Sequence, residues 1–377
     1  MAGLLILVED PGAANFAAAL PAGLRGLGHS AELWARGHAR ARLAELGVPC
    51  RTAEGPPERL LGDGAVRAVA VGTAEDPDCH GLTLIDLARR NGLVSIGLVD
   101  GPANADLRFR GRGGHPLAHA PDWLAVPDPG SRRRYLDLGF PAARIVACGH
   151  PHFDRVRRVG EALDQEGREA VRRRLFADAG LRPILAFLAE LSHGLAPANF
   201  RSGPDYTLTG RGSRGRTEIA LEEVLDALPP GPGRPYVVLR LHPKNGADDY
   251  AAYAGEVDCI SRREAALEVV FAADLVVGLS TVLLDEAAVL GRPTLAVLPR
   301  PAEREWLQSV AWGATQAVSE RTDLRHRLAG WLAGEREARP ARLPPPGAEA
   351  RLCAFVADIL AKSAAPPPAA SHDIARV

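Results

Sequence analysis

Short apolar runs recur along the chain, and each is followed by a polar or glycine-containing turn and then by a helical pattern. The first run is "LLILV", residues 4–8; "EDPGAAN" ends it, and "FAAALPAGLRGLG" predicts a helix closed by Gly28. Further runs in the first half are "AELWA", "AVRAVAVGT", "LVSIGLVD" and "RIVACGH". Strands that alternate with helices in this way are typical of parallel α/β sheets.

A charged helical pattern over about residues 155–180 separates this series from a second one. The second series consists of "PILAFLAE", "YVVLRLH", "EVDCIS", "DLVVGLS" and "PTLAVLP". A chain of 377 residues also exceeds the size at which one hydrophobic core stops growing. We therefore predict an α/β protein with two Rossmann-like, doubly wound domains that face a cleft.

The change in pattern gives the expected domain limits. The N-terminal domain should span residues 1–160 and the C-terminal domain residues 161–345. "GAEARLCAFVADILAKS" predicts a final helix over residues 346–363, and the Pro- and Ala-rich residues 364–377 are expected to be a disordered tail.

Composition indicates an ordinary soluble protein, with 46% hydrophobic and 24% charged residues. Lys and Arg number 45 against 46 Asp and Glu, so the net charge of -1 gives no field for holding nucleic acid or an anionic membrane. Any anion site must therefore be local. No apolar run reaches the roughly 18 residues of a membrane-spanning helix, and the N-terminal run lacks the basic flank of a signal peptide.

The five cysteines are far apart and form no C-x-x-C pair, which predicts a reduced, cytoplasmic setting. High Ala, Arg, Gly and Pro content indicates a GC-rich bacterial genome. The absence of G-x-G-x-x-G after the first strand argues against a nicotinamide oxidoreductase, and the absence of G-x-x-x-x-G-K-[ST] argues against a P-loop nucleotidase.

"VLRLHPKNG" carries an apolar strand directly into three groups that can bind an anion, Arg240, His242 and Lys244. In an open α/β sheet, ligands bind outside the carboxyl ends of the strands. His242 and Lys244 can donate to phosphate oxygens, and Arg240 can add a planar fork. A solvated strand end whose cations face water is the alternative.

"DLVVGLSTVLLDEAAVLGRP" predicts a buried strand followed by a helix that Ser280 or Thr281 caps. The free N–H groups of that helix would form a second anion site, and Glu286 lies one turn further on. A capped helix with an acidic first turn explains the serine and threonine without any ligand.

Together these two segments resemble the donor-binding half of GT-B glycosyltransferases, in the "HP" branch of bacterial sialyltransferases, capsule Kdo transferases and CDP-glycerol glycerophosphotransferases. "STVLLDEAAVLGRP" is also similar to "SGGIQEEAPSLGKP" of UDP-GlcNAc 2-epimerase, an isomerase that shares this fold. The resemblance covers about residues 236–300. It implies that His242 and Ser280 or Thr281 contact nucleotide phosphates and that Glu286 contacts the ribose.

The first half should then hold the acceptor, and a transferase needs a base to deprotonate it. "VEDPGAAN" ends the first strand with Glu9 and Asp10, followed by Gly12 and Asn15. The acidic pair resembles the one ahead of glycine in sialyltransferases, although Pro11 intervenes here. We predict Asp10 as the base, Glu9 as the second candidate, and Gly12 and Asn15 as substrate contacts; capping of the next helix is the alternative for Asp10.

Three further segments contain candidate residues. Asp100 in "LVDGPANAD" ends another strand and is expected to support catalysis or to form an Asx turn. Ser192 and His193 in "ELSHGL" follow the first strand of the second half and are predicted phosphate contacts. We interpret His150 and His152 in "GHPHFD" as hinge packing, because a metal site needs further ligands.

The segment "TLTGRGSRGRTE", residues 207–218, is rich in glycine and arginine. We interpret it as a solvated loop; a loop that closes over an anionic ligand is the alternative.

The sequence thus predicts a metal-independent glycosyltransferase that moves a sugar or related group from a nucleotide-activated donor to a hydroxyl or other nucleophile. The reaction would be a base-assisted in-line displacement onto a small-molecule or polymer acceptor. The nucleotide-sugar, of unidentified base, is a substrate, and no cofactor or metal is predicted. Donor and acceptor are the expected partners, and a homodimer is compatible with the sequence.

Two alternatives stay open. One is a nucleotide-sugar 2-epimerase, hydrolysing or non-hydrolysing, and the other is a non-catalytic nucleotide-sugar-binding protein. "RLHPK" favours the transferase over the epimerase, while Glu9, Asp10 and Asp100 argue against a silent binding protein.

Overall fold

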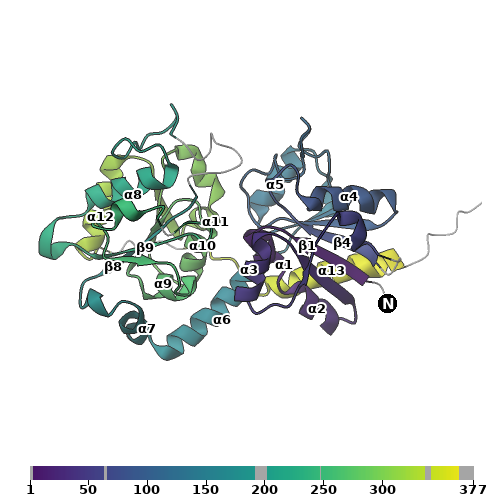
Figure 1. The fold of residues 1–377 in the computed structure, drawn as a ribbon, viewed down its shortest axis with the longest axis horizontal. Helices are drawn as coiled ribbons and strands as arrows, with labels where there is room; N and C mark the ends of the chain where they lie inside the picture. The colour runs from purple at the N-terminus through teal and green to yellow at the C-terminus, as the bar shows by residue number, and fades with distance from the viewer. Residues whose placement is uncertain (1–2, 63–65, 192–201, 247, 336–340, 365–377) are drawn as a thin grey trace, which may run out of the picture. The chain divides into compact units, whose positions relative to one another are not determined.

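The chain divides into two compact units in a computed structural model that describes residues 3–62, 66–191, 202–246, 248–335 and 341–364 (Figure 1). Unit 1 comprises residues 1–100, 104–152 and 347–377, and unit 2 comprises residues 101–103 and 153–346. The predicted boundary at residue 160 therefore falls inside helix α6 (Pro151–Glu166). The predicted tail lies outside the described residues from residue 365 onward.

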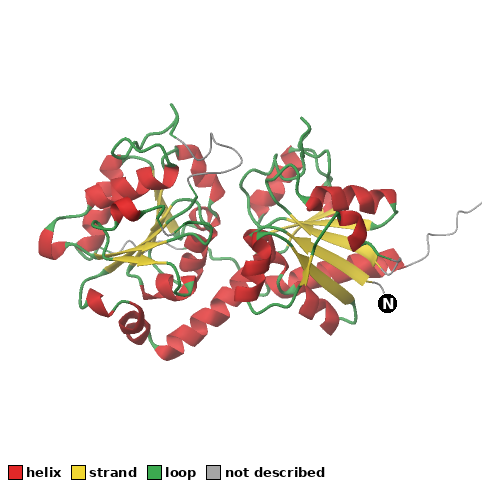
Figure 2. Cartoon of the chain, viewed as in Figure 1, coloured by secondary structure: helices red, strands yellow, loops and turns green. Residues whose placement is uncertain are grey.

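Unit 1 is built on a seven-stranded parallel sheet with strand order β3-β2-β1-β4-β5-β6-β7 and with helices on both faces (Figure 2). Its strands are β1 (Gly3–Val8), β2 (Ser30–Ala35), β3 (Arg51–Thr52), β4 (Val66–Gly72), β5 (Val94–Leu98), β6 (Trp123–Val126) and β7 (Ile145–Ala147). Its helices are α1 (Pro11–Ala17), α2 (Leu20–Gly26), α3 (His38–Glu45), α4 (His80–Arg90), α5 (Pro129–Asp137) and α13 (Ala348–Ala364).

The side chains of β1 alternate between two hydrophobic cores. Leu4 and Ile6 pack on the face that α1, α2 and α13 cover. Leu5 and Leu7 pack on the opposite face with residues of α4 and α5. Because both faces of the sheet are buried, its central strands are continuous apolar runs rather than alternating ones.

The single helix predicted over "FAAALPAGLRGLG" is wrong, because two short helices, α1 and α2, occupy this region. Pro11 is at the start of α1 and Pro21 is in the first turn of α2. Proline lacks an N–H and is tolerated only in the first turn of a helix, so Pro21 begins a new helix instead of continuing the old one.

Unit 2 is built on a six-stranded parallel sheet with strand order β10-β9-β8-β11-β12-β13. Its strands are β8 (Ile184–Leu188), β9 (Tyr236–Arg240), β10 (Cys259–Ser261), β11 (Leu275–Gly278), β12 (Thr294–Val297) and β13 (Thr315–Val318). Its helices are α7 (Arg168–Leu175), α8 (Arg216–Ala227), α9 (Ala266–Ala272), α10 (Val282–Val289), α11 (Gln308–Ala311) and α12 (Arg321–Leu332).

Each sheet is doubly wound, and its strand order reverses once. The reversal lies between β1 and β4 in unit 1 and between β8 and β11 in unit 2. The prediction of two Rossmann-like domains is confirmed. Within the described residues, none of the helices combines the length and apolar character needed to cross a membrane.

Asp285 is an acidic side chain inside unit 2, buried in α10. Its Oδ1 accepts a hydrogen bond from the Ser309 N–H at 2.8 Å. Burial raises the pKa of the Asp285 carboxyl to about 7, because the hydrogen bonds from Ser309 compensate only in part for the lost hydration. The ionised form of Asp285 therefore destabilises the folded state.

We expect Asp285→Asn to stabilise the protein at pH 8 and to have little effect near pH 4. The wild-type chain loses stability as pH rises from the unfolded pKa of 3.8 to the folded value of about 7. A shift of this size corresponds to roughly 4 kcal/mol at most, or several degrees in the thermal midpoint. Thermal unfolding at several pH values measures the difference.

Asp274→Asn is the matched control, because Asp274 pairs with Arg168 and Arg172 and these interactions lower its pKa despite burial. Its loss should destabilise the protein at pH 8. Equal midpoints for Asp285→Asn and wild type at pH 8 would contradict the assignment.

Candidate functional site

The two anion-binding segments predicted from the sequence lie at one edge of the unit 2 sheet. β9 and β11 pair with β8 on opposite sides, and all three strands run parallel. The "HPK" segment follows β9, the Ser280–Thr281 pair follows β11, and Glu190 follows β8 between them. This edge includes the point where the strand order reverses, which is the usual ligand position in such sheets.

His242 is held in an orientation that defines its ring proton. Its Nδ1 accepts a hydrogen bond from the Lys244 N–H at 3.1 Å, and its own N–H donates to Asn245 Oδ1 at 2.9 Å. The neutral ring therefore carries its proton on Nε2, which is a hydrogen-bond donor suited to a phosphate oxygen.

Arg240 is buried at the end of β9 and contacts the neighbouring strand. Its Nη1 donates to Ser261 Oγ at 3.0 Å, and Glu264 lies 3.8 Å from the same nitrogen. These contacts connect the strand ends of β9 and β10. The Arg240 guanidinium therefore has a structural role between these strands, in addition to the ligand contact predicted from the sequence.

The start of α10 is capped as predicted, and it also holds an internal anion. Thr281 is the N-cap residue, and its hydroxyl accepts from the Leu283 N–H at 3.3 Å. The Ser280 N–H donates to Glu190 Oε1 at 2.6 Å, and Ser280 Oγ lies 3.3 Å from Glu190 Oε2. Glu286 is buried in the same helix.

Arg216, the first residue of α8, connects these groups. Its Nη1 donates to Glu190 Oε2 at 2.7 Å and its Nη2 to Ser280 Oγ at 2.9 Å. Its Nε donates to both oxygens of Glu303 at 3.0 Å. Only 1% of the Arg216 side chain is exposed. Burial acts against its charged form, but Glu190 and Glu303 outweigh this effect and raise its pKa above the ordinary value.

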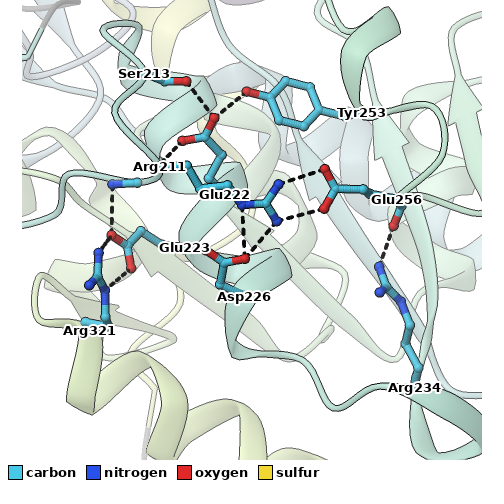
Figure 3. Close-up of polar contacts among 10 residues, drawn as sticks. Arg211, Ser213, Glu222, Glu223, Asp226, Arg234, Tyr253, Glu256 and Arg321 are labelled. Carbon is cyan, nitrogen blue, oxygen red and sulfur yellow. Dashed lines mark hydrogen bonds and ion pairs between the residues drawn. The ribbon is translucent and has the colours of Figure 1, made fainter.

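The arginine-rich segment that precedes α8 is fastened to that helix by two consecutive buried glutamates (Figure 3). Glu223 Oε1 accepts from the Gly210 N–H at 2.9 Å, and Glu222 Oε2 accepts from the Arg211 N–H at 2.7 Å. The Tyr253 hydroxyl donates to Glu222 Oε1 at 2.8 Å.

The Arg211 guanidinium bonds to Asp226 and Glu256, both at 2.7 Å (Figure 3). This part of the segment is therefore neither a simple solvated loop nor a source of uncommitted cations. Its contacts fix the approach to α8 and so help to place Arg216.

A second polar cluster lies at the carboxyl edge of the unit 1 sheet. Glu9 follows β1, and its Oε2 accepts a hydrogen bond from the Gly81 N–H at the start of α4, at 3.0 Å. Arg36 Nε lies 3.9 Å from Glu9 Oε1, and Arg36 Nη1 lies 3.1 Å from His80 Nδ1. The carboxylate of Glu9 thus occupies the reversal point of this sheet.

Asp100, which follows β5, is held by a buried arginine. Arg108 Nη1 donates to Asp100 Oδ1 at 2.6 Å and to Thr73 Oγ1 at 2.7 Å. Burial opposes the charge of Arg108, but Asp100 raises its pKa above the ordinary value. The other oxygen of Asp100 packs against Gly12, where a Cβ atom would lie 1.7 Å from Oδ2.

Asp10 is the N-cap residue of α1, but its side chain makes no capping hydrogen bond. The alternative in which this carboxylate caps the helix is therefore wrong. Asn15 is buried, and its Oδ1 accepts from Arg42 Nε at 2.7 Å. Ser192 and His193 lie outside the described residues.

His150 and His152 are buried in unit 1, next to the boundary with unit 2. The His150 ring packs edge-on against Phe16 with centroids 5.2 Å apart, and its Nδ1 accepts from the His152 N–H at 3.3 Å. Across the parts of the chain that the structure describes, no group of three or more His, Cys, Asp or Glu residues is arranged to hold a metal ion.

A cavity of about 390 Å³ lies beside β13, an edge strand of the unit 2 sheet. Arg304, Thr315, Asp323, His326 and Arg327 are among the residues that line it. None of its lining residues was predicted as a site residue.

Sequence reasoning did not identify Glu190, Arg216 and Glu303 in unit 2 or Arg108 in unit 1. Glu190 is the last residue of the predicted run "PILAFLAE", so the rule that led to His242 could have found it. Arg216 and Glu303 lie in segments without a strand-end signal.

No protein-family model and no curated protein matches the sequence significantly. Among solved structures, UDP-GlcNAc 2-epimerase from Neisseria meningitidis bound to UDP-GlcNAc matches with a TM-score of 0.64 and 14% identity, over 96% of this chain and 100% of that one. The S. aureus MnaA–UDP co-structure matches with a TM-score of 0.68 and 11% identity, over 96% of this chain and 97% of that one. UDP-GlcNAc 2-epimerase from Methanocaldococcus jannaschii matches with a TM-score of 0.63 and 13% identity, over 96% of this chain and 99% of that one.

The chain has a GT-B-like fold. At 11% to 14% identity, this likeness concerns the fold alone. The GT-B-like assignment agrees with the resemblance noted on residues 236–300.

We expect Gly12→Ala to lower both stability and activity, because the new methyl group would overlap the Asp100 carboxylate and displace it from Arg108. The overlap should cost about 1–3 kcal/mol in the free energy of unfolding, measured by chemical denaturation.

Gly26→Ala is the matched control, because it lies in helix α2 and a Cβ there meets nothing within 4 Å. That substitution should be neutral or slightly stabilising. Equal stabilities for the two variants would show that the Asp100 side chain moves away from the new methyl group without lowering the free energy of unfolding.

Proposed function

We propose that the protein is a nucleotide-sugar 2-epimerase, an enzyme that inverts one carbon of the sugar in a nucleotide-sugar. The observation that carries the proposal is that the two segments predicted to bind an anion lie at one edge of the unit 2 sheet, on either side of β8. This edge includes the strand-order reversal between β8 and β11, where such sheets usually bind a ligand. The whole-length likeness to UDP-GlcNAc 2-epimerases favours epimerisation over transfer.

The nucleotide is assigned to unit 2. Phosphate oxygens would accept hydrogen bonds from His242 Nε2, Lys244 and the first turn of α10. Arg240 would reinforce this positive region from the end of β9. The ribose contact of Glu286 remains a prediction, since only 4% of that residue is exposed.

The base is assigned to unit 1. Epimerisation removes a proton from carbon and returns a proton to the opposite face, so it requires a base and a proton donor. We assign the base to Asp10, whose side chain makes no capping bond to α1. Glu9 and Asp100, fixed by the Gly81 amide and by Arg108, are assigned supporting roles.

A glycosyltransferase is the second candidate, and the "RLHPK" segment favours it. Its His242 carries the Nε2 proton that a departing phosphate would accept, as the resemblance to the "HP" branch implies. Such an enzyme needs an acceptor, whereas an epimerase needs only the nucleotide-sugar.

The proposal is tested by incubating the protein with UDP-GlcNAc in D₂O and following the C2 position by NMR. An epimerase exchanges the C2 hydrogen for deuterium and forms the 2-epimer, bound to UDP or released from it. Asp10→Asn should reduce the exchange rate by orders of magnitude and leave UDP affinity within a few-fold of wild type.

Turnover that requires an added acceptor, with no deuterium at C2, would replace the epimerase by the transferase. Binding of UDP-GlcNAc without any turnover would leave only a binding function. Unchanged exchange in Asp10→Asn would move the base to Glu9 or Asp100.

We expect His242→Ala to weaken UDP binding by about tenfold or more, because a donor to the phosphate is lost. Isothermal titration calorimetry measures the change, and circular dichroism checks the fold.

His326→Ala in the same unit is the control, since His326 lies on α12 and is not among the residues assigned to the nucleotide. Equal UDP affinity in the two variants would remove His242 from the phosphate site.

A further inference from the structure

The two units share an arrangement that was not predicted from the sequence. In each, a glutamate soon after the first strand bonds to a backbone amide at the start of the helix that follows the adjacent strand. Glu190 accepts from the Ser280 N–H before α10, and Glu9 accepts from the Gly81 N–H of α4. Each glutamate also has an arginine partner, Arg216 or Arg36.

Amides at a helix start attract anions, because their N–H groups are unpaired within the helix and the helix dipole is positive there. In unit 2 the Glu190 carboxylate accepts from the Ser280 amide, one residue before the N-cap Thr281 of α10, and also contacts the buried cation Arg216. Two groups suited to bind a phosphate at the end of β11, the Ser280 amide and Arg216, are therefore already bonded to a carboxylate of the protein itself.

The two carboxylates that hold Arg216 differ in accessibility. The Glu190 side chain is 12% exposed, whereas that of Glu303 is fully buried. Glu303 keeps Arg216 paired through bonds to Nε at 3.0 Å and to Nη2 at 2.7 Å, and it also accepts from Arg300 Nε at 2.8 Å. Glu190 can therefore move away from Arg216 without leaving a buried charge uncompensated.

Two hydrogen bonds hold the backbone at this point. The Tyr250 hydroxyl donates to the Glu190 carbonyl at 3.1 Å, and the preceding residue, Ala189, donates its N–H to the Arg240 carbonyl at 2.8 Å. Neither bond involves the Glu190 carboxylate, so they do not oppose a change in its side-chain torsions.

We propose that Glu190 is an internal competitor for the phosphate: the diphosphate of the ligand displaces its carboxylate from the Ser280 amide and from Arg216. This inference rests on the proposed function in identifying the anion as a nucleotide diphosphate. It makes Glu190 a residue that sets affinity for the anion and not a ligand contact.

The test compares wild type, Glu190→Gln and Glu303→Gln by calorimetric titration with UDP and, separately, with inorganic pyrophosphate. Glu190→Gln should bind both probes about tenfold more tightly, since a neutral amide competes poorly for a cation and an N–H donor. Glu303→Gln is the matched control, because Glu303 contacts the same arginine but not the Ser280 amide. It should give no gain in affinity.

Glu190→Asp is included in case Glu190→Gln fails to fold. It keeps the charge but is one methylene shorter, so it cannot span both partners in the same way, and it should also bind more tightly. Equal or weaker binding of both probes by the folded Glu190 variants overturns the inference.

Tighter pyrophosphate binding by Glu190→Gln, in a protein that shows no UDP binding, supports the inference and removes the proposed function. Equal tightening in Glu303→Gln would mean that the gain comes from Arg216 alone and would also overturn the role given to Glu190.

Discussion

Burial of both sheet faces is the constraint on which the rest of this structure depends. Once helices cover both sides of a parallel sheet, the strand ends are the part of the sheet where polar groups can stay accessible to a ligand. Alternate residues of β1 illustrate this, since both sets face hydrophobic cores. The polar residues of interest, Glu9, Asp100, Glu190 and His242, all lie within two residues of a strand's carboxyl end.

The same constraint explains why the charges at these edges are paired. Arg108 and Arg216 are both buried, and each would carry a large desolvation cost without a carboxylate beside it. Asp100 pairs with the first, and Glu190 and Glu303 pair with the second. On the proposed function, affinity for a nucleotide diphosphate depends on how firmly the internal carboxylates are held as well as on the number of cations present.

The fold could be predicted from the sequence because its signal is local: a buried strand needs an uninterrupted apolar run, and such runs are visible one at a time. The motif positions around His242 and Ser280 followed from the same rule. The side chains that pair with one another at the site could not be predicted. Arg216 lies 26 residues from Glu190 and 87 from Glu303 in sequence. Only the strand order brings them together, and no periodicity encodes it. Strands β3, β6 and β13 were not predicted; β13, "TQAV", contains two polar residues and so lacks a continuous apolar run.

The final helix of the chain belongs to the first unit. Leu352, Val356 and Ile359 of α13 are buried in the same core as Leu20 and Leu24 of α2. All strands of unit 2 precede α13 in the chain, so the unit 1 core lacks these side chains until α13 has been made. During synthesis from the N-terminus, unit 2 can therefore complete its core before unit 1 acquires α13.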